Sequence, residues 1–276
     1  MYHLQKIRGN PRASRRRGLT LTEMLIAMTL MVMLSGGLLA LATTVESGVK
    51  TVQGQDAAAM HARVVIDRIQ RSINAAYANE HFPGFMAFGK HPGQYDLPDS
   101  LVIWRPTGAP ANPDGLPRWD EMVVYTTDES YPNRIIEIQY PTDTWNVPPL
   151  DDESDWEMEL SSRSYDMVYS TTIGVLTDLL RVGVADSNIV RGAIRFHVTH
   201  TPSLEDMQSF EAGTQDWHDL PWPQDLYGPT SGTRQSWCRF EFQLLPGEEV
   251  QKQEPTSDKA IPFFGSAAIY YQLPRS

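Results

Sequence analysis

The sequence predicts an α+β protein in which a long N-terminal helix packs on a mainly antiparallel β-sheet body. Three observations support this fold class. Residues 19–42 form an apolar run, and a proline-free segment with apolar residues at helical spacing continues to Ala78. The rest of the chain breaks into short stretches rich in β-branched and aromatic residues. A long helix followed by a series of strands is typical of the α+β class.

Charge is distributed unevenly along the chain. There are 23 Lys and Arg against 34 Asp and Glu, a net charge of −11. Six of the basic residues lie in the first 18 residues, which contain no acid, so 17 basic residues face 34 acidic ones in the remainder. An acidic body argues against a nucleic-acid partner, and a single cysteine excludes an intramolecular disulfide. The short basic head indicates a targeting segment.

We expect four segments. Residues 1–18 are a basic leader, 19–42 the membrane-spanning half of the helix, 43–80 its half beyond the membrane, and 81–276 a globular body. As a helix the apolar run measures about 36 Å, enough to cross a hydrocarbon core of about 30 Å. The positive-inside rule keeps the preceding arginines in the cytoplasm. These features predict a single-pass bacterial inner-membrane protein with a cytoplasmic N-terminus and a periplasmic body.

Three kinds of segment fit the apolar run: a plain signal anchor, a secretory signal, or a signal that is cut before the run. Ala40-Leu41-Ala42 matches an A-x-A cleavage site, which would release a protein that begins at Thr43. Glu23, the only ionisable residue in the run, distinguishes the three. A carboxylate in hydrocarbon is costly unless it is paired, and neither an anchor nor a secretory signal gains from it.

The residues around Glu23 resemble the N-terminus of type IV pilins and type II secretion pseudopilins. The basic run Arg15–Arg17 precedes Gly18, Leu19 opens the apolar run, and Glu23 is its fifth residue. The resemblance covers about the first 45 residues. It implies a pilin-like fold, cleavage between Gly18 and Leu19 by a prepilin peptidase, and methylation of the new Leu19 amine. The family usually has Phe at this first position, so Leu19 is a departure. In an assembled filament, Glu23 would pair with the amine of a neighbouring subunit.

The resemblance leads us to expect a non-catalytic minor pseudopilin-like subunit of a type II secretion or related type IV filament machine. The alternative is an exported soluble protein or enzyme released by signal peptidase after Ala42. The lone Cys238 favours the pseudopilin, because type IV pilins often close a C-terminal loop with a disulfide. The expected partners are prepilin peptidase, other pilins or pseudopilins, and the inner membrane. We expect no catalytic residue, cofactor or metal.

Past the membrane, the helix should pack one face on a sheet, because Ile66, Ile69 and Ile73 are too apolar for a solvated rod. Gly36 and Gly37 lie in the middle of the membrane segment. They indicate either local melting during assembly or close packing against another helix.

Alternation of apolar and polar residues predicts six strands, the second and third forming a hairpin. We also expect a helix at Ile173–Val182. The predicted strands are Leu101–Arg105, Glu121–Thr126, Arg134–Tyr140, Gly192–Thr199, Trp237–Leu245 and Ser266–Leu273.

Two segments look like loops. Residues 201–236 lack periodicity and carry Trp217, Trp222 and Tyr227, which either pack on one another or bind a partner. The acidic run Asp151–Asp155 lacks the glycine and glutamate of an EF-hand, so we interpret it as a solvated loop.

Three further residues belong to types that can bind a metal or act as a nucleophile. His197 and His200 are three apart on a predicted strand, so they face opposite sides and cannot share a metal. Cys238 lies between aromatic neighbours and should be a packed, inert thiol.

Overall fold

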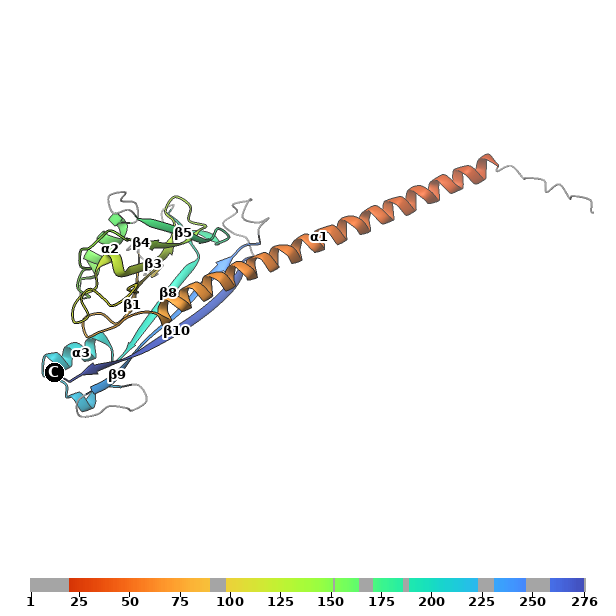
Figure 1. Cartoon of the computed structure of the whole chain (residues 1–276). Coiled ribbons are helices and arrows are strands. Elements are labelled where there is room, and N and C mark those ends of the chain that lie inside the picture. Colours follow the sequence, from red (N-terminus) through yellow and green to blue (C-terminus); the bar gives the residue numbers. More distant parts are fainter. Residues whose placement is uncertain are drawn as a thin grey trace, which may run out of the picture. The chain divides into compact units, whose positions relative to one another are not determined.

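A computed structural model describes residues 20–89, 98–150, 152–163, 171–185, 189–222, 231–246 and 259–275. The chain divides into two compact units, Met1–Val52 and Gln53–Ser276. The predicted α+β class is confirmed: a long helix is followed by antiparallel sheets (Figure 1).

The first unit contains the N-terminal part of helix α1, which runs from Leu21 to Asn74. All described residues of this unit are exposed, and the helix is apolar on every side. A helix with no polar face is typical of a membrane span or of a helix that other helices surround. Of the described residues, this helix alone is long and apolar enough to cross a membrane.

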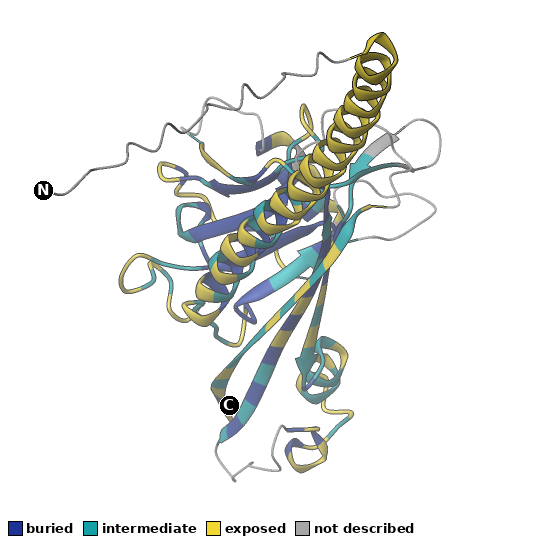
Figure 2. Cartoon of the chain, turned by 90° about the vertical axis from the view of Figure 1, so that its right-hand side faces the viewer, coloured by how far each residue is buried: buried dark blue, intermediate teal, exposed yellow. Residues whose placement is uncertain are grey.

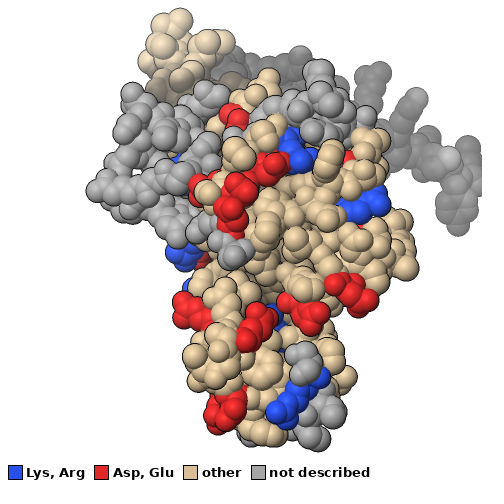
Figure 3. Space-filling view, turned by 90° about the vertical axis from the view of Figure 1, so that its left-hand side faces the viewer, with Lys and Arg blue, Asp and Glu red and all other residues tan. Residues whose placement is uncertain are grey.

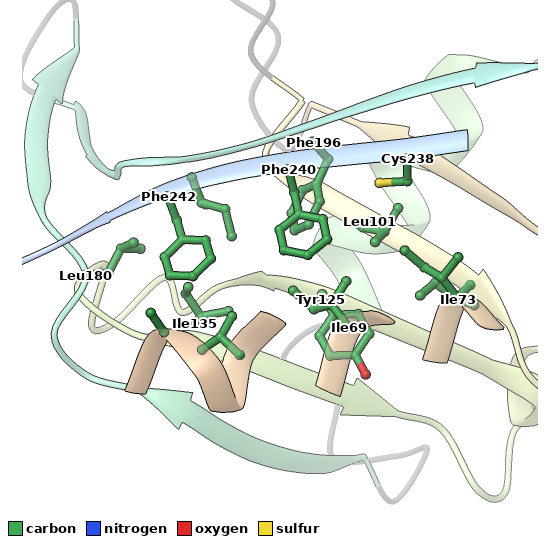
Figure 4. Packing of buried hydrophobic residues seen from close by; sticks show 14 of the residues in the cluster. Ile69, Ile73, Leu101, Tyr125, Ile135, Leu180, Phe196, Cys238, Phe240 and Phe242 are labelled. Atoms are coloured by element: carbon green, nitrogen blue, oxygen red, sulfur yellow. The ribbon is translucent and has the colours of Figure 1, made fainter. Parts of the chain in front are cut away.

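In the second unit, one face of α1 is completely buried. Ala58, Ala62, Val65, Ile69 and Ile73 follow one another at intervals of three or four residues, and each is at most 1% exposed. This stripe contacts both sheets of the body (Figure 4). The predicted packing of the helix on a sheet is therefore confirmed.

The larger sheet has five antiparallel strands in chain order. It confirms the predicted hairpin, which is formed by the third and fourth strands. Its central strands are buried on both faces. One face joins the core under α1, and the other packs against a cluster of aromatic side chains. The strands are β1 (Phe85–Phe88), β2 (Ser100–Trp104), β3 (Met122–Thr127), β4 (Ile135–Gln139) and β5 (Thr172–Thr177). A short 3-10 helix, η1 (Trp119–Glu121), precedes β3.

The smaller sheet has three antiparallel strands, β8 (Ile194–Thr201), β9 (Ser231–Leu244) and β10 (Ile261–Pro274), with β9 in the middle. Burial alternates strictly along β9, as Figure 2 shows by alternating colours. One face therefore points into the core under α1 and the other points outward. A separate hairpin joins β6 (Val182–Ala185) to β7 (Ile189–Gly192).

The predicted helix at Ile173–Val182 is wrong. The segment forms β5, a turn, and the start of β6. Leu176, Leu179 and Leu180 fit helical spacing. However, Gly174 and the β-branched residues around it favour a strand, and pairing with β4 decides the outcome.

The acidic run is also not a loop. Asp151 lies outside the described residues, and the rest of the run leads into helix α2, Glu153–Arg163. Asp152 Oδ1 accepts hydrogen bonds from the Asp155 backbone N–H (3.1 Å) and the Ser154 hydroxyl (2.9 Å), which lower the pKa of Asp152. Acids in a first turn complement the helix dipole. The helix buries Trp156 against the five-stranded sheet, stacked on Phe88 with ring centroids 4.9 Å apart.

Residues 201–236 contain more regular structure than predicted. Strand β8 extends to Thr201, helix α3 spans Leu204–Glu211, a 3-10 helix (η4) spans Trp217–Asp219, and β9 begins at Ser231. Trp217 and Trp222 are buried together, with ring centroids 4.8 Å apart. They pack on each other, which is the first of the two expected arrangements. Tyr227 lies outside the described residues.

A partly buried polar network holds α1 on the five-stranded sheet. Arg68 of α1 donates two hydrogen bonds to Glu137 of β4, at 2.6 and 2.7 Å. Tyr125 of β3 donates a third, at 3.0 Å. The Ser72 hydroxyl lies 2.6 Å from that of Tyr125 and accepts a hydrogen bond from Arg105 at 2.7 Å. Because these groups sit at fixed places on α1 and on two strands, they set the register of the helix against the sheet.

Burial alone would raise the pKa of Glu137, but the hydrogen bonds from Arg68, Tyr125 and Gln139 outweigh it and lower the pKa below its ordinary value of 4.5. A carboxylate with a lowered pKa stabilises the fold above its unfolded-state pKa. That contribution is lost as the pH falls through the folded-state pKa.

We predict that Glu137→Gln lowers the free energy of unfolding by about 1–3 kcal/mol at pH 7, because it leaves Arg68 without a charged partner. The variant should also lose stability less steeply than wild type below pH 4.5. Urea unfolding of the detergent-solubilised chain at several pH values measures both effects. Arg71→Ala, which breaks an exposed pair with Asp67 on the same helix, is the control and should change stability by less than about 0.5 kcal/mol. Equal effects of the two variants would contradict the assigned role.

Candidate functional site

The candidate site lies at the start of α1 and consists of a reciprocal cap between Thr20 and Glu23. The Thr20 backbone N–H and hydroxyl both donate to Glu23 Oε2, at 2.9 and 3.0 Å. The Glu23 N–H donates back to Thr20 Oγ1 at 3.3 Å. This is a capping box, in which Thr at the N-cap and Glu three residues later satisfy each other's free backbone donors. Glu23 therefore fixes where the helix begins.

Sequence reasoning identified Glu23 but missed Thr20. The signal was present, since a threonine followed three residues later by a glutamate, just before an apolar run, is a known helix start. The other two predicted site residues, Gly18 and Leu19, lie outside the described residues.

The hydrogen bonds of the cap leave half of the Glu23 carboxylate available. Both bonds from Thr20 end on Oε2, and no described residue donates a hydrogen bond to Oε1. All atoms of the cap also belong to residues that follow the predicted cleavage point after Gly18. Removal of the leader would therefore leave the cap intact and Oε1 able to accept a further donor.

Around the cap, the helix surface is suited to an apolar environment. Leu21, Met24, Leu25 and Ile26 are each more than half exposed. Several hydroxyl groups further along the helix are satisfied internally: Thr29, for example, donates to the Leu25 carbonyl at 2.7 Å. This segment can therefore bury its whole surface in lipid or among other helices, and Glu23 is the only charged side chain it brings with it.

Gly36 and Gly37 lie within the uninterrupted helix, and a Cβ at either position would meet no atom within 4 Å. Nothing in the part of the chain that the structure describes therefore requires glycine here. A need for glycine at these two positions would come from the molecules that surround the helix.

The remaining candidates are structural. His197 is exposed, whereas His200 faces the core side and lies 3.0 Å from the Ser236 hydroxyl, so the two do point to opposite faces. Burial raises the pKa of Cys238 to about 12, consistent with a packed thiol. Among the described residues, no group of three or more His, Cys, Asp or Glu could hold a metal ion.

Residues 13–39 match the family described as the prokaryotic N-terminal methylation motif. This segment is the signature of type IV pilin-like and pseudopilin proteins, so the resemblance seen around Gly18 and Glu23 is confirmed over that range. No curated protein and no solved structure matches the chain.

We predict that Thr20→Val frays the first turn of α1, because the Glu23 carboxylate loses one donor and the Glu23 N–H loses its acceptor. Amide hydrogen exchange of the chain in detergent micelles should be faster at Leu21–Met24 than in wild type. Thr29→Val, which removes a similar hydroxyl from the helix interior, is the control and should leave those amides unchanged. Unchanged exchange in Thr20→Val would show that the cap does not hold the helix start.

Proposed function

We propose that this chain, which carries the prepilin-type N-terminal segment, is a non-catalytic minor pseudopilin-like subunit of a type II secretion or related type IV filament machine. The match of residues 13–39 to the methylation motif carries the proposal. In this account a prepilin peptidase cuts between Gly18 and Leu19 and methylates the Leu19 amine. The motif favours this route over release after Ala42, because its defining residues Gly18, Leu19 and Glu23 lie at the start of the apolar run rather than at its end.

The membrane arrangement follows from charge and hydropathy. The basic leader stays in the cytoplasm, the apolar part of α1 spans the inner membrane, and the acidic body lies in the periplasm. The exposure of large apolar side chains all round this part of α1 supports a span or a helix bundle. Assembly into a pseudopilus would then move the helix from lipid to a bundle of similar helices.

Glu23 is the residue that makes such a bundle specific. Its Oε2 caps its own helix, and its Oε1 can accept a hydrogen bond from the cationic amine of Leu19 in a neighbouring subunit. An uncompensated charge in an apolar bundle is strongly unfavourable, so only one axial alignment of the two helices satisfies both groups. The carboxylate would thereby set the register of assembly without taking part in any reaction.

The single cysteine favours a secretion machine over a fibre. The chain has one cysteine, Cys238, which is buried in β9. It cannot form the intramolecular disulfide that closes the C-terminal loop of many type IV pilins, and this favours a pseudopilin.

We predict that Glu23→Ala separates processing from assembly. Cleavage after Gly18 should continue, because the scissile bond is unchanged. Methylation of Leu19 should fall, and crosslinks between the apolar helices of neighbouring subunits should fall about tenfold or more, because the Leu19 amine loses its partner. Mass spectrometry of the N-terminal peptide and in-membrane crosslinking measure these outcomes.

Glu46→Ala is the matched control, since Glu46 is a carboxylate of the same helix that pairs with Lys50 at an exposed position. It should leave both readouts unchanged. Normal assembly of Glu23→Ala, or failure of both variants alike, would contradict the proposed pairing.

A further inference from the structure

The outward face of the three-stranded sheet carries a groove. It has a volume of about 630 Å³ and is lined by Arg195, His197, Trp237, Arg239, Glu241 and Phe264, with a few neighbours. The five-stranded sheet packs on both faces, whereas the groove leaves this face of β8, β9 and β10 accessible, with Gln70 of α1 at its border, where its side chain donates a hydrogen bond to the Ser266 carbonyl at 2.9 Å. The volume lies in the range that is typical of ligand-binding pockets.

The groove has the opposite charge to the rest of the body. Arg195 pairs with Glu241 across β8 and β9 at 2.9 Å, which neutralises both. Arg239, on the middle strand, is exposed and forms no ion pair within the part of the chain that the structure describes. It lies opposite His197 on β8 and Ser266 on β10, so no carboxylate is directly across from it. The groove thus offers an uncompensated guanidinium on a protein that is otherwise acidic.

Two aromatic side chains flank this guanidinium. Trp237 precedes Arg239 by two residues on the same face of β9. Phe264 of β10 pairs with Glu241, so it lies diagonally across from Arg239 on the side away from Trp237. They are 37% and 66% exposed, whereas Phe196, Phe240 and Phe242 on the inner face are buried. Aromatic and arginine side chains together are the residue types that most often dominate binding energy at protein interfaces. A ligand that suits all three has a carboxylate with an apolar side chain next to it.

We propose that this groove docks an acidic segment of a neighbouring pilin-type subunit, with a carboxylate on Arg239 and an apolar side chain between Trp237 and Phe264. The inference rests on the proposed function for the kind of neighbour, and on charge complementarity for the contact. The body of this chain is acidic, and Asp and Glu predominate among the charged side chains on the face drawn in Figure 3. A cationic groove lets one acidic body bind another, where two acidic faces would repel.

The test places a photocrosslinking amino acid, p-benzoylphenylalanine, at Phe264 of the full-length chain in its native membranes. The same amino acid at Trp145, which is 70% exposed and outside the groove, is the control position. We expect the Phe264 position to give an adduct whose peptide is an acidic segment of a pilin-type subunit, either another copy of this chain or a different subunit. The adduct should decrease about tenfold in Arg239→Glu. It should persist in Arg239→Lys and in Arg71→Glu, a charge reversal on α1 outside the groove.

Reversing the charge of the crosslinked acid to lysine should restore the adduct in Arg239→Glu. The inference is overturned if Phe264 crosslinks no more than Trp145, if Arg239→Glu leaves the adduct unchanged, or if the adduct is lipid, nucleic acid or a non-acidic peptide. Leader removal is read by mass spectrometry in the same sample. A retained leader contradicts the proposed function, whereas a processed chain without the adduct contradicts only the groove.

Discussion

Burial of one face of α1 against both sheets is the constraint on which the body depends. The stripe from Ala58 to Ile73 contacts the inner faces of the five-stranded and the three-stranded sheets, and the side chains of the helix and of both sheets form one shared core. Arg68 and Glu137 add a directional contact to this non-directional burial. Apolar packing tolerates small shifts along a helix, but a two-bond ion pair does not, so the register of the helix is defined. The outward face of the three-stranded sheet is left for other contacts.

The part of α1 before Val52 has a different surface from the part that packs on the sheets. There it has no buried face, its surface is apolar on all sides, and its only charge before Glu46 is Glu23. The cap between Thr20 and Glu23 gives this part of the helix a defined start that does not depend on the leader. Under the proposed function the subunit loses its leader and moves between lipid and a helix bundle. It would then need such a start, because neither environment offers water to satisfy free backbone donors.

Much of this architecture could be predicted from local patterns. Alternation of apolar and polar residues identified parts of the long strands β9 and β10. The helical spacing of Ile69 and Ile73 identified the face of α1 that packs on a sheet. One error arose where two periodicities agree with one sequence: the leucines of 176–180 fit a helix, and pairing with β4 makes residues 172–177 a strand. Others arose in polar segments, where the expected loops are helices α2 and α3. Glu23 was found because a charge in an apolar run is conspicuous. The groove was not found, because Arg239 and Phe264 come together only through the register of β9 and β10.

The most direct test of the whole account is the N-terminal peptide of the protein purified from its native membranes. The account predicts a peptide that begins at Leu19 and carries one methyl group on its amine. A peptide that begins at Thr43 would contradict it and indicate an exported soluble protein. An intact N-terminus at Met1 would contradict it as well, since the apolar helix would then be a plain signal anchor.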